Sequence, residues 1–280
     1  MGIVNINDDS FSGEGSLDVE RALAQARALV KAGADIVDVG GESARTNRCE
    51  ISVEEEIARV APFVGRFGEC HQAVDPVDQE QLFPPMLSLN TWRPPVVRAL
   101  LPLGVDILND IGAFANAENA ITAAETGAAL VIMHSVGRPK VPHFHIQYPD
   151  IMQTLDQFFD SKMIAANEAG LSPVAVILDP GIDFAKQRSD NLRIFRELSR
   201  LSRFQRPILL PVSRKTVIGE VLGLPEPKDR DAGTIACIVA GLRAGAVIFR
   251  VHNVSAASLA IRTIWSVTVG TSSRSSVGRA

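Results

Sequence analysis

Eight short apolar runs rich in β-branched residues recur along the chain, and each is followed by a polar cluster and then by a stretch with helical spacing. The runs cover residues 2–6, 35–39, 86–89, 105–108, 129–133, 174–178, 208–212 and 247–251. Strands that alternate with helices in this way are typical of repeated βα units and a parallel sheet. Because eight units make a (β/α)8 barrel, we expect the α/β class and a single TIM barrel.

The stretches between the runs have the apolar spacing and the end signals of helices. One face of the first stretch carries Val19, Leu23, Ala26 and Val30. Ser52 followed by Glu55 has the spacing of a capping box. Five glycines stand where a helix must end just before a strand, namely Gly33, Gly104, Gly127, Gly170 and Gly245.

One barrel domain is expected over residues 1–269, since about 250 residues suffice for such a barrel. Residues 270–280 have no periodicity and are expected to form a disordered tail. Two connections exceed the needs of a minimal barrel. Residues 68–85 resemble an insertion before the third strand, and the proline-containing residues 135–149 form a candidate active-site loop.

Composition excludes several classes of partner. The 28 basic and 32 acidic side chains give a net charge of −4 without any Lys/Arg run, which argues against nucleic acid or a membrane surface. No apolar stretch of about 18 residues and no signal-peptide pattern occurs, so a cytoplasmic protein is expected. Cys49, Cys70 and Cys237 match no zinc spacing and are expected to be reduced thiols.

Polar residues follow every predicted strand. In a (β/α)8 barrel the catalytic groups come from the carboxyl ends of the strands, where these residues would converge. Amides, carboxylates and cations are costly to desolvate unless they are paired or used, so this mouth is the candidate site. The chemistry-bearing residues there include Asn5, Asp8, Asp9, Asn90, Asn109, Asp179, Lys215, Arg250 and His252.

These residues divide by chemistry into three groups. Three residues could hydrogen-bond the edge of a flat heterocycle, namely Asn90, Asn109 and Asp179. A phosphate suits the basic groups after the last two strands, Lys215, Arg250 and His252. Mg²⁺ shared with substrate phosphates suits Asn5, Asp8 and Asp9. The implied ligand is a heterocycle that carries a phosphate or a diphosphate.

Each group also has a simpler interpretation. Asp8-Asp9 and Asn109-Asp110 could only cap the helices that follow them. Lys215 taken alone is compatible with a Schiff-base lysine or with an ordinary salt bridge. No zinc site is expected, because no histidine has acidic or histidine partners at ligand spacing.

Taken together, the strand ends resemble the dihydropteroate synthases from residue 2 to about residue 267. Seven motifs occur in the family's order, at residues 2–12, 38–43, 109–111, 133–134, 178–181, 213–215 and 250–252. The resemblance implies condensation of 6-hydroxymethyl-7,8-dihydropterin pyrophosphate with para-aminobenzoate, giving 7,8-dihydropteroate and pyrophosphate for folate synthesis. It also implies Mg²⁺ as cofactor and a homodimer.

The resemblance further implies a role for each matching residue. The pterin would bind to Asn90, Asn109, Met133, Asp179 and Lys215. The diphosphate would bind to Asn5, Arg250 and His252, with Asn5 as the Mg²⁺ ligand. The aminobenzoate would bind to Phe11, Ala44, Arg45, Phe184 and Thr216. The catalytic residues would be Asp179, Lys215, Arg250 and His252.

A dissociative mechanism follows from these roles. Pyrophosphate leaves first, the pterin methylene becomes cationic, and the aromatic amine attacks it. Mg²⁺, Arg250 and His252 would meet the charge that develops on the diphosphate, while Asp179 would favour the electron-poor pterin. No strong general base is needed, because the aromatic amine is already nucleophilic.

The chain departs from the family pattern at a few site positions. Asn90 stands where a pterin-facing aspartate is usual, which predicts altered pterin affinity or pH dependence. Ala44, Thr46, Asp183 and Thr216 replace threonine, proline, glycine and serine on the aminobenzoate side. Their clustering predicts a form of the enzyme that is insensitive to sulfonamides.

Three alternatives remain open at the level of sequence. A corrinoid-linked methyltransferase barrel also binds a reduced pterin, but it gives no reason for the basic diphosphate site. A Schiff-base aldolase built on Lys215 does not explain the amides that suit a pterin. A non-catalytic pterin-binding protein would bind the pterin without releasing pyrophosphate.

Overall fold

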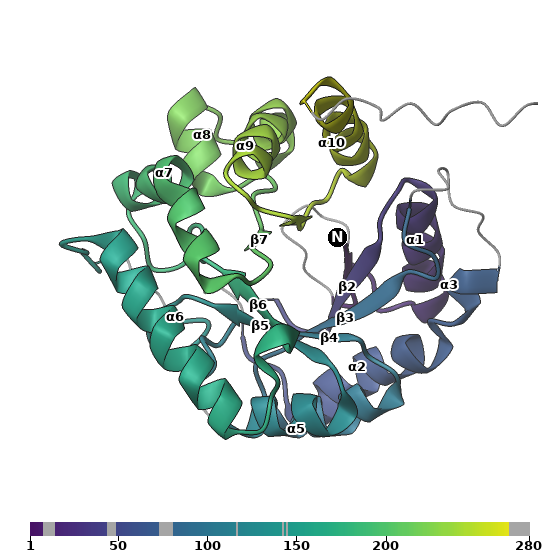
Figure 1. Ribbon diagram of the computed structural model, residues 1–280. Helices are drawn as coiled ribbons and strands as arrows, with labels where there is room; N and C mark the ends of the chain where they lie inside the picture. Colours follow the sequence, from purple (N-terminus) through teal and green to yellow (C-terminus); the bar gives the residue numbers. More distant parts are fainter. Residues whose placement is uncertain are drawn as a thin grey trace, which may run out of the picture.

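The computed structural model describes residues 1–7, 15–43, 49–72, 81–115, 117–141, 143 and 145–268. Within these residues, eight parallel strands form a closed barrel (Figure 1). The strands are β1 (Gly2–Asn5), β2 (Ile36–Gly40), β3 (Met86–Asn90), β4 (Ile107–Asp110), β5 (Ala129–Met133), β6 (Val176–Asp179), β7 (Leu209–Leu210) and β8 (Ile248–Phe249). The expected α/β barrel is therefore confirmed.

Closure of the barrel depends on two isolated bridges. Strands β1 to β6 form one continuous parallel sheet, and β7 pairs with β8 in a separate two-stranded sheet. The pair Leu178 and Ile208 joins β6 to the β7 segment, and the pair Gly2 and Val251 joins the β8 segment to β1. These bridges complete the ring.

Helices cover the outside of the ring (Figure 1). The α-helices are α1 (Val19–Lys31), α2 (Val53–Arg66), α3 (Glu69–Gln72), α4 (Pro94–Leu100), α5 (Glu118–Thr126), α6 (Ile151–Glu168), α7 (Arg188–Glu197), α8 (Thr216–Leu222), α9 (Asp231–Arg243) and α10 (Val254–Thr268). Short 3-10 segments are η1 (Leu101–Leu103), η2 (Pro173–Ala175), η3 (Leu198–Phe204) and η4 (Pro227–Arg230). None of the helices in the described residues has the length and apolar character needed to span a bilayer.

Local sequence signals explain where these helices begin and end. The Ser52 side chain accepts a hydrogen bond from the backbone N–H of Glu55, which is the predicted cap of α2. The face of α1 is confirmed, since Leu23, Ala26 and Val30 are buried. All five predicted helix-ending glycines have positive φ, a conformation that costs glycine little.

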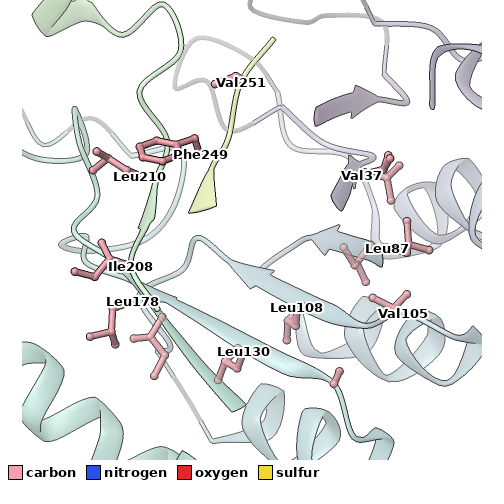
Figure 2. Packing of buried hydrophobic residues seen from close by; sticks show 14 of the residues in the cluster. Val37, Leu87, Val105, Leu108, Leu130, Leu178, Ile208, Leu210, Phe249 and Val251 are labelled. Carbon is pink, nitrogen blue, oxygen red and sulfur yellow. The ribbon is translucent and has the colours of Figure 1, made fainter. Parts of the chain in front are cut away.

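Two apolar clusters place the site within the barrel. The larger lies between strands and helices, where Figure 2 shows Val37, Leu87 and Leu130 facing the helices. The smaller is formed by Met1 together with strand residues on the opposite faces, namely Ile36, Ile107, Val131, Ile177 and Leu209. Side chains alternate along a strand, so positions two residues further on point into the barrel above this smaller cluster. Those positions include Asp38, Asn109, Met133 and Asp179.

Some predicted boundaries are wrong. The runs at residues 208–212 and 247–251 contain strands of only two residues each, and β7 is followed directly by Pro211, which has no backbone N–H to extend the ladder. Val174 and Ala175, predicted to begin a strand, lie in a 3-10 turn, and β6 begins at Val176. Of the predicted insertion, residues 69–72 form α3, whereas residues 73–80 lie outside the described residues, as does the predicted tail 270–280.

Candidate active site

A buried carboxylate, Asp38 of β2, stands at the centre of the polar layer. It is fully buried, and its Oδ2 accepts a hydrogen bond from Arg250 Nε at 2.7 Å. Ser88 Oγ donates to Oδ1 at 2.5 Å, and Asn109 Nδ2 lies 3.2 Å from Oδ2. Asn90 Nδ2 donates to the same oxygen at 3.4 Å. One carboxylate thus brings together side chains from β3, β4 and the end of β8.

Sequence reasoning assigned no role to Asp38, although it stands in one of the family motifs. The available signal was a charged residue inside the apolar run Ile36-Val37-Asp38-Val39. A charge in such a position must be paired or used, because a lone buried carboxylate is strongly disfavoured. Its partners, however, are 50 to 212 residues away in the sequence and could not be identified from the pattern.

Asp179 ends β6 and is also buried. Its Oδ1 accepts the backbone N–H of Gly181 at 2.7 Å. Burial raises the pKa of this carboxyl to about 6, and the charges of Lys215, Lys186 and Arg250 oppose that rise. Asp179 is therefore a carboxylate that ionises just below neutral pH and faces three cations. Met133 is its register partner on β5 and is likewise buried.

Lys215 and Phe184 lie in contact, although they were predicted to serve different substrates. Lys215 Nζ is 4.6 Å from the centre of the Phe184 ring and donates to the carbonyl of Ile182 at 2.9 Å. Burial lowers the pKa of Lys215, and the carboxylates of Asp183 and Asp179 partly restore it. A cation over an aromatic face fixes both side chains at the boundary between the two predicted subsites.

Lys186 is a second buried lysine that the sequence did not single out. Its Nζ lies 2.8 Å from His134 Nδ1 and donates to the carbonyls of Phe184 at 3.0 Å and His134 at 3.2 Å. Burial lowers the pKa of Lys186 to about 7. Burial, followed by the charge of Lys186, lowers the pKa of His134 to about 2, so its imidazole is neutral. Lys186 thereby anchors the loop that carries Asp179 and Phe184.

On the predicted anion side, His252 is a neutral hydrogen-bonding group rather than a fixed cation. Burial, with Arg250 as the next cause, lowers the pKa of His252 to about 3. Its Nδ1 lies 2.8 Å from Ser213 Oγ, and Ser213 Oγ also accepts the backbone N–H of His252. The permanent positive charge on this side therefore comes from Arg250, which Asp38 orients through Nε.

A metal ion of the predicted type is compatible with Asn5. This residue ends β1, the strand that neighbours the β8 segment carrying Arg250 and His252. Mg²⁺ commonly takes only one or two protein oxygens and completes its shell with water and phosphate. Asp8 and Asp9 lie outside the described residues, within which no group of three or more His, Cys, Asp or Glu side chains could hold a metal.

The remaining predicted residues occupy different places. Thr216 is the first residue of α8, directly after Lys215, and is exposed. Asp183 has a φ of 65°, the left-handed conformation that favours glycine, and its carboxylate accepts from Val217 N and Asn191 Nδ2. Phe11, Ala44 and Arg45 lie outside the described residues.

Comparison with known proteins gives consistent matches over nearly the whole chain. A family model described as pterin binding enzyme matches residues 1–252. The dihydropteroate synthase of Escherichia coli strain K12 is 35% identical over 265 residues, which are 94% of this chain and 89% of that protein.

Solved structures agree with these matches. Dihydropteroate synthase from Clostridium difficile, crystallised in the presence of pteroic acid, is 34% identical with a TM-score of 0.83, and the match covers 96% of this chain and 95% of that one. Dihydropteroate synthase of Xanthomonas albilineans with 4-aminobenzoic acid is 32% identical with a TM-score of 0.82, over 95% of this chain and 92% of that one.

Proposed function

The chain belongs to the pterin-binding enzyme family as a dihydropteroate synthase, and we propose that the barrel mouth around Asp38, Asp179 and Arg250 is its active site. Dihydropteroate synthase is a transferase that joins 6-hydroxymethyl-7,8-dihydropterin pyrophosphate to para-aminobenzoate and releases pyrophosphate. This is the activity expected from the sequence motifs, and the family resemblance is confirmed.

The pterin pocket in this proposal is the polar layer inside the barrel. Asp179 accepts from the donor pair of the pterin ring, Asn109 binds its edge, and Met133 and Lys215 line the slot. Asn90 belongs to the same layer through its bond to Asp38. The elevated pKa of Asp179 supports this role, because a buried carboxylate gains most from a ligand that donates two hydrogen bonds.

The leaving diphosphate is assigned to Arg250, His252 and Asn5. Arg250 uses Nε for Asp38, and no hydrogen bond from its terminal nitrogens is found within the described residues, so these nitrogens are assigned to the anion. His252 donates a hydrogen bond to the diphosphate from a neutral ring. An approaching anion would raise the pKa of this ring. Mg²⁺, held by Asn5 and the diphosphate itself, would supply further neutralisation of the leaving group when bound.

The chemical step is then a separation of charge inside a preorganised site. The C–O bond of the hydroxymethyl pyrophosphate breaks, its electron pair leaves with pyrophosphate, and the methylene carbon becomes cationic. Arg250 stabilises the anionic fragment, while Asp179 stabilises the electron-poor pterin. The amine nitrogen of aminobenzoate attacks the methylene carbon and then loses a proton. Phe184 and Thr216, with Phe11, Ala44 and Arg45, are assigned to the aminobenzoate.

The observation that carries this assignment is the Arg250–Asp38 contact, because it fixes the cation of one subsite to the polar layer of the other. The direct test measures pyrophosphate release from dihydropterin pyrophosphate with Mg²⁺, with and without aminobenzoate. Release that depends on aminobenzoate is expected, and pterin binding without any release would contradict catalysis at this site.

Three further properties are proposed on family grounds. A homodimer is expected and can be tested by light scattering in solution. A cytoplasmic location suits an enzyme whose described helices include none able to span a bilayer. Reduced sulfonamide sensitivity is proposed from the substitutions at Ala44, Thr46, Asp183 and Thr216.

A further inference from the structure

The turn that follows β6 is joined to two helices by one carboxylate, that of Asp183. Its Oδ1 accepts hydrogen bonds from Val217 N at 3.3 Å and from Asn191 Nδ2 at 3.1 Å, and Asn191 Oδ1 accepts from Asp183 N at 2.9 Å. Val217 lies in the first turn of α8, where backbone N–H groups have no partner within the helix, and Asn191 lies in α7. Asp183 therefore fixes the turn to the starts of both helices.

The two chain neighbours of Asp183 both contact Lys215. Lys215 Nζ donates to the carbonyl of Ile182 at 2.9 Å and lies 4.6 Å from the centre of the Phe184 ring. Lys215 is also the residue directly before α8, so the bond from Val217 N to Asp183 holds the backbone beside the same lysine. The place of the Lys215 ammonium group therefore depends on how this turn is docked on α8.

The backbone of the turn shows why a side-chain contact is needed there. Gly181, Asp183 and Ala185 have φ values of 69°, 65° and 49°, which lie in the left-handed region. Residues other than glycine adopt this region at a cost, and they keep it only where surrounding contacts hold them. The carboxylate of Asp183 supplies such contacts to two helices. A glycine would adopt the same φ more easily but would supply neither contact.

The charge of Asp183 acts on the same lysine. Burial lowers the pKa of Lys215, and among the charges that raise it Asp183 comes before Asp179. Arg250, from the end of β8, lowers the pKa of Lys215. Lys186, in the β6–α7 loop, is a further cation, and its own pKa is lowered by the charge of Lys215. The carboxylate of Asp183 thus favours the charged form of Lys215 among several cations.

We propose that Asp183 is a positioning residue that seats the Lys215 ammonium group and the Phe184 ring at the boundary between the pterin and aminobenzoate subsites. It acts through these two side chains and is not assigned a contact with either substrate. This inference rests on the proposed function, which assigns Lys215 to the pterin and Phe184 to the aminobenzoate.

The test compares Asp183→Asn with Asp183→Gly. Asparagine keeps the Oδ1 that accepts from Val217 and Asn191 but lacks the charge, whereas glycine suits the backbone but lacks both the acceptor and the charge. We expect Asp183→Gly to raise the KM for aminobenzoate by about fivefold, because the turn that carries Phe184 loses its bonds to both helices. Asp183→Asn should keep this KM within about twofold of the parent value.

Asp190→Asn is the matched control. Asp190 is a buried carboxylate in the first turn of α7, and it accepts from Gln187 N at 2.9 Å. It is not among the charges that act on Lys215. The control therefore removes a buried charge close to the same turn without removing a bond to α8.

A second readout is independent of turnover and reports the charge on Lys215 directly. Lys215 keeps some exposed surface, so its reaction with acetic anhydride can be followed by mass spectrometry of the free enzyme at a series of pH values. Only the uncharged amine reacts. The midpoint pH of this reaction should be lower in Asp183→Asn and in Asp183→Gly than in the parent, and unchanged in Asp190→Asn.

Either readout can overturn the proposal. It fails if the midpoint for Lys215 is the same in the parent and both Asp183 variants, or if Asp190→Asn moves it equally. It also fails if Asp183→Asn and Asp183→Gly have the same KM for aminobenzoate. Failure of the proposed function is distinguishable, because the parent would then show no aminobenzoate-dependent release of pyrophosphate while the labelling of Lys215 still tests the role of Asp183.

Discussion

Arg250 and Asp38 form an ion pair across the barrel interior, with 2.7 Å between Arg250 Nε and Asp38 Oδ2, although 212 residues separate them. Asp38 is fully buried and Arg250 is largely so. The pair links β2 to the end of β8, which lie on either side of β1. It therefore connects the two proposed subsites, for pterin and for diphosphate, by a direct contact.

Replacement of Asp38 by asparagine should impair use of the pterin substrate. The asparagine side chain keeps the shape but leaves the guanidinium of Arg250 without its counter-ion, and a broken buried pair costs about 3 kcal/mol. We expect kcat/KM for dihydropterin pyrophosphate to fall by roughly 100-fold. Steady-state kinetics check this, with Ser88→Ala as a milder control that removes one hydrogen bond to the same carboxylate. An Asp38→Asn enzyme with normal kinetics would show that the pair is only structural.

Asp179 and Asp110 offer a matched comparison of pH dependence. Each is buried, each accepts from the N–H two residues later at 2.7 Å, and burial raises the pKa of each to about 6. The unfolded value is near 3.8, so folding disfavours the ionised form above pH 6 by about 3 kcal/mol per group, and this cost vanishes below pH 4.

Asp179→Asn and Asp110→Asn should therefore both unfold at higher denaturant concentration than the parent at pH 8, but not at pH 4. Only Asp179→Asn should lose activity, because Asp110 bonds to Asn119 on the outer side of the barrel. Denaturant melts at both pH values and pyrophosphate release measure the two effects. Equal loss of activity in both variants would contradict the assignment of Asp179 to the pterin.

Asn90→Asp should introduce a like-charge contact. Asn90 Nδ2 donates to Asp38 Oδ2 at 3.4 Å, and a carboxylate in its place would face Asp38 directly. The pKa of the new carboxyl should rise, so the variant should lose stability as pH increases above about 4, the ordinary pKa of an aspartate. Thermal unfolding across this range tests the effect, with Asp38→Asn/Asn90→Asp as the control that removes the repulsion. Melting that is independent of pH would argue against the contact.

On the proposal of reduced sulfonamide sensitivity, Thr216→Ser should make the enzyme more sensitive to these inhibitors. The extra methyl group of Thr216 lies at the exposed start of α8, beside Lys215. A contact of this size is worth about 1.4 kcal/mol, so the inhibition constant of sulfamethoxazole should fall by about tenfold. Thr263→Ser, at an exposed position of α10, serves as the control. Identical inhibition constants for the parent and Thr216→Ser would remove Thr216 from the explanation.

The barrel could be predicted from the sequence because strand and helix periods alternate eight times, and because helix-ending glycines mark the junctions. The lengths of β7 and β8 could not be predicted, because an apolar run does not show where the hydrogen bonds between neighbouring strands end. Three residues could be predicted to belong to the site because they follow predicted strands, namely Lys215, Asp179 and Arg250.

Other features of the site depend on contacts between distant segments. Asp38 of β2 and Arg250 after β8, for example, are brought together by closure of the barrel. Lys186 gave no signal, because a loop lysine is normally solvated and only the fold buries it. Phe11, Ala44 and Arg45 stay predictions from family resemblance.

The short β7 and β8 strands have a consequence for local stability. In the described residues one isolated bridge joins each to the six-stranded sheet, with a further bond from the Met1 amino group to the carbonyl of Phe249, so this quarter of the wall has the fewest ladder hydrogen bonds. Amide protons in β7 and β8 should consequently exchange with solvent deuterium before those of β2 to β5. Lys215, Arg250 and His252 all follow these two strands, so we expect the proposed diphosphate site to lie on the part of the barrel that opens most easily and that a bound diphosphate would protect most.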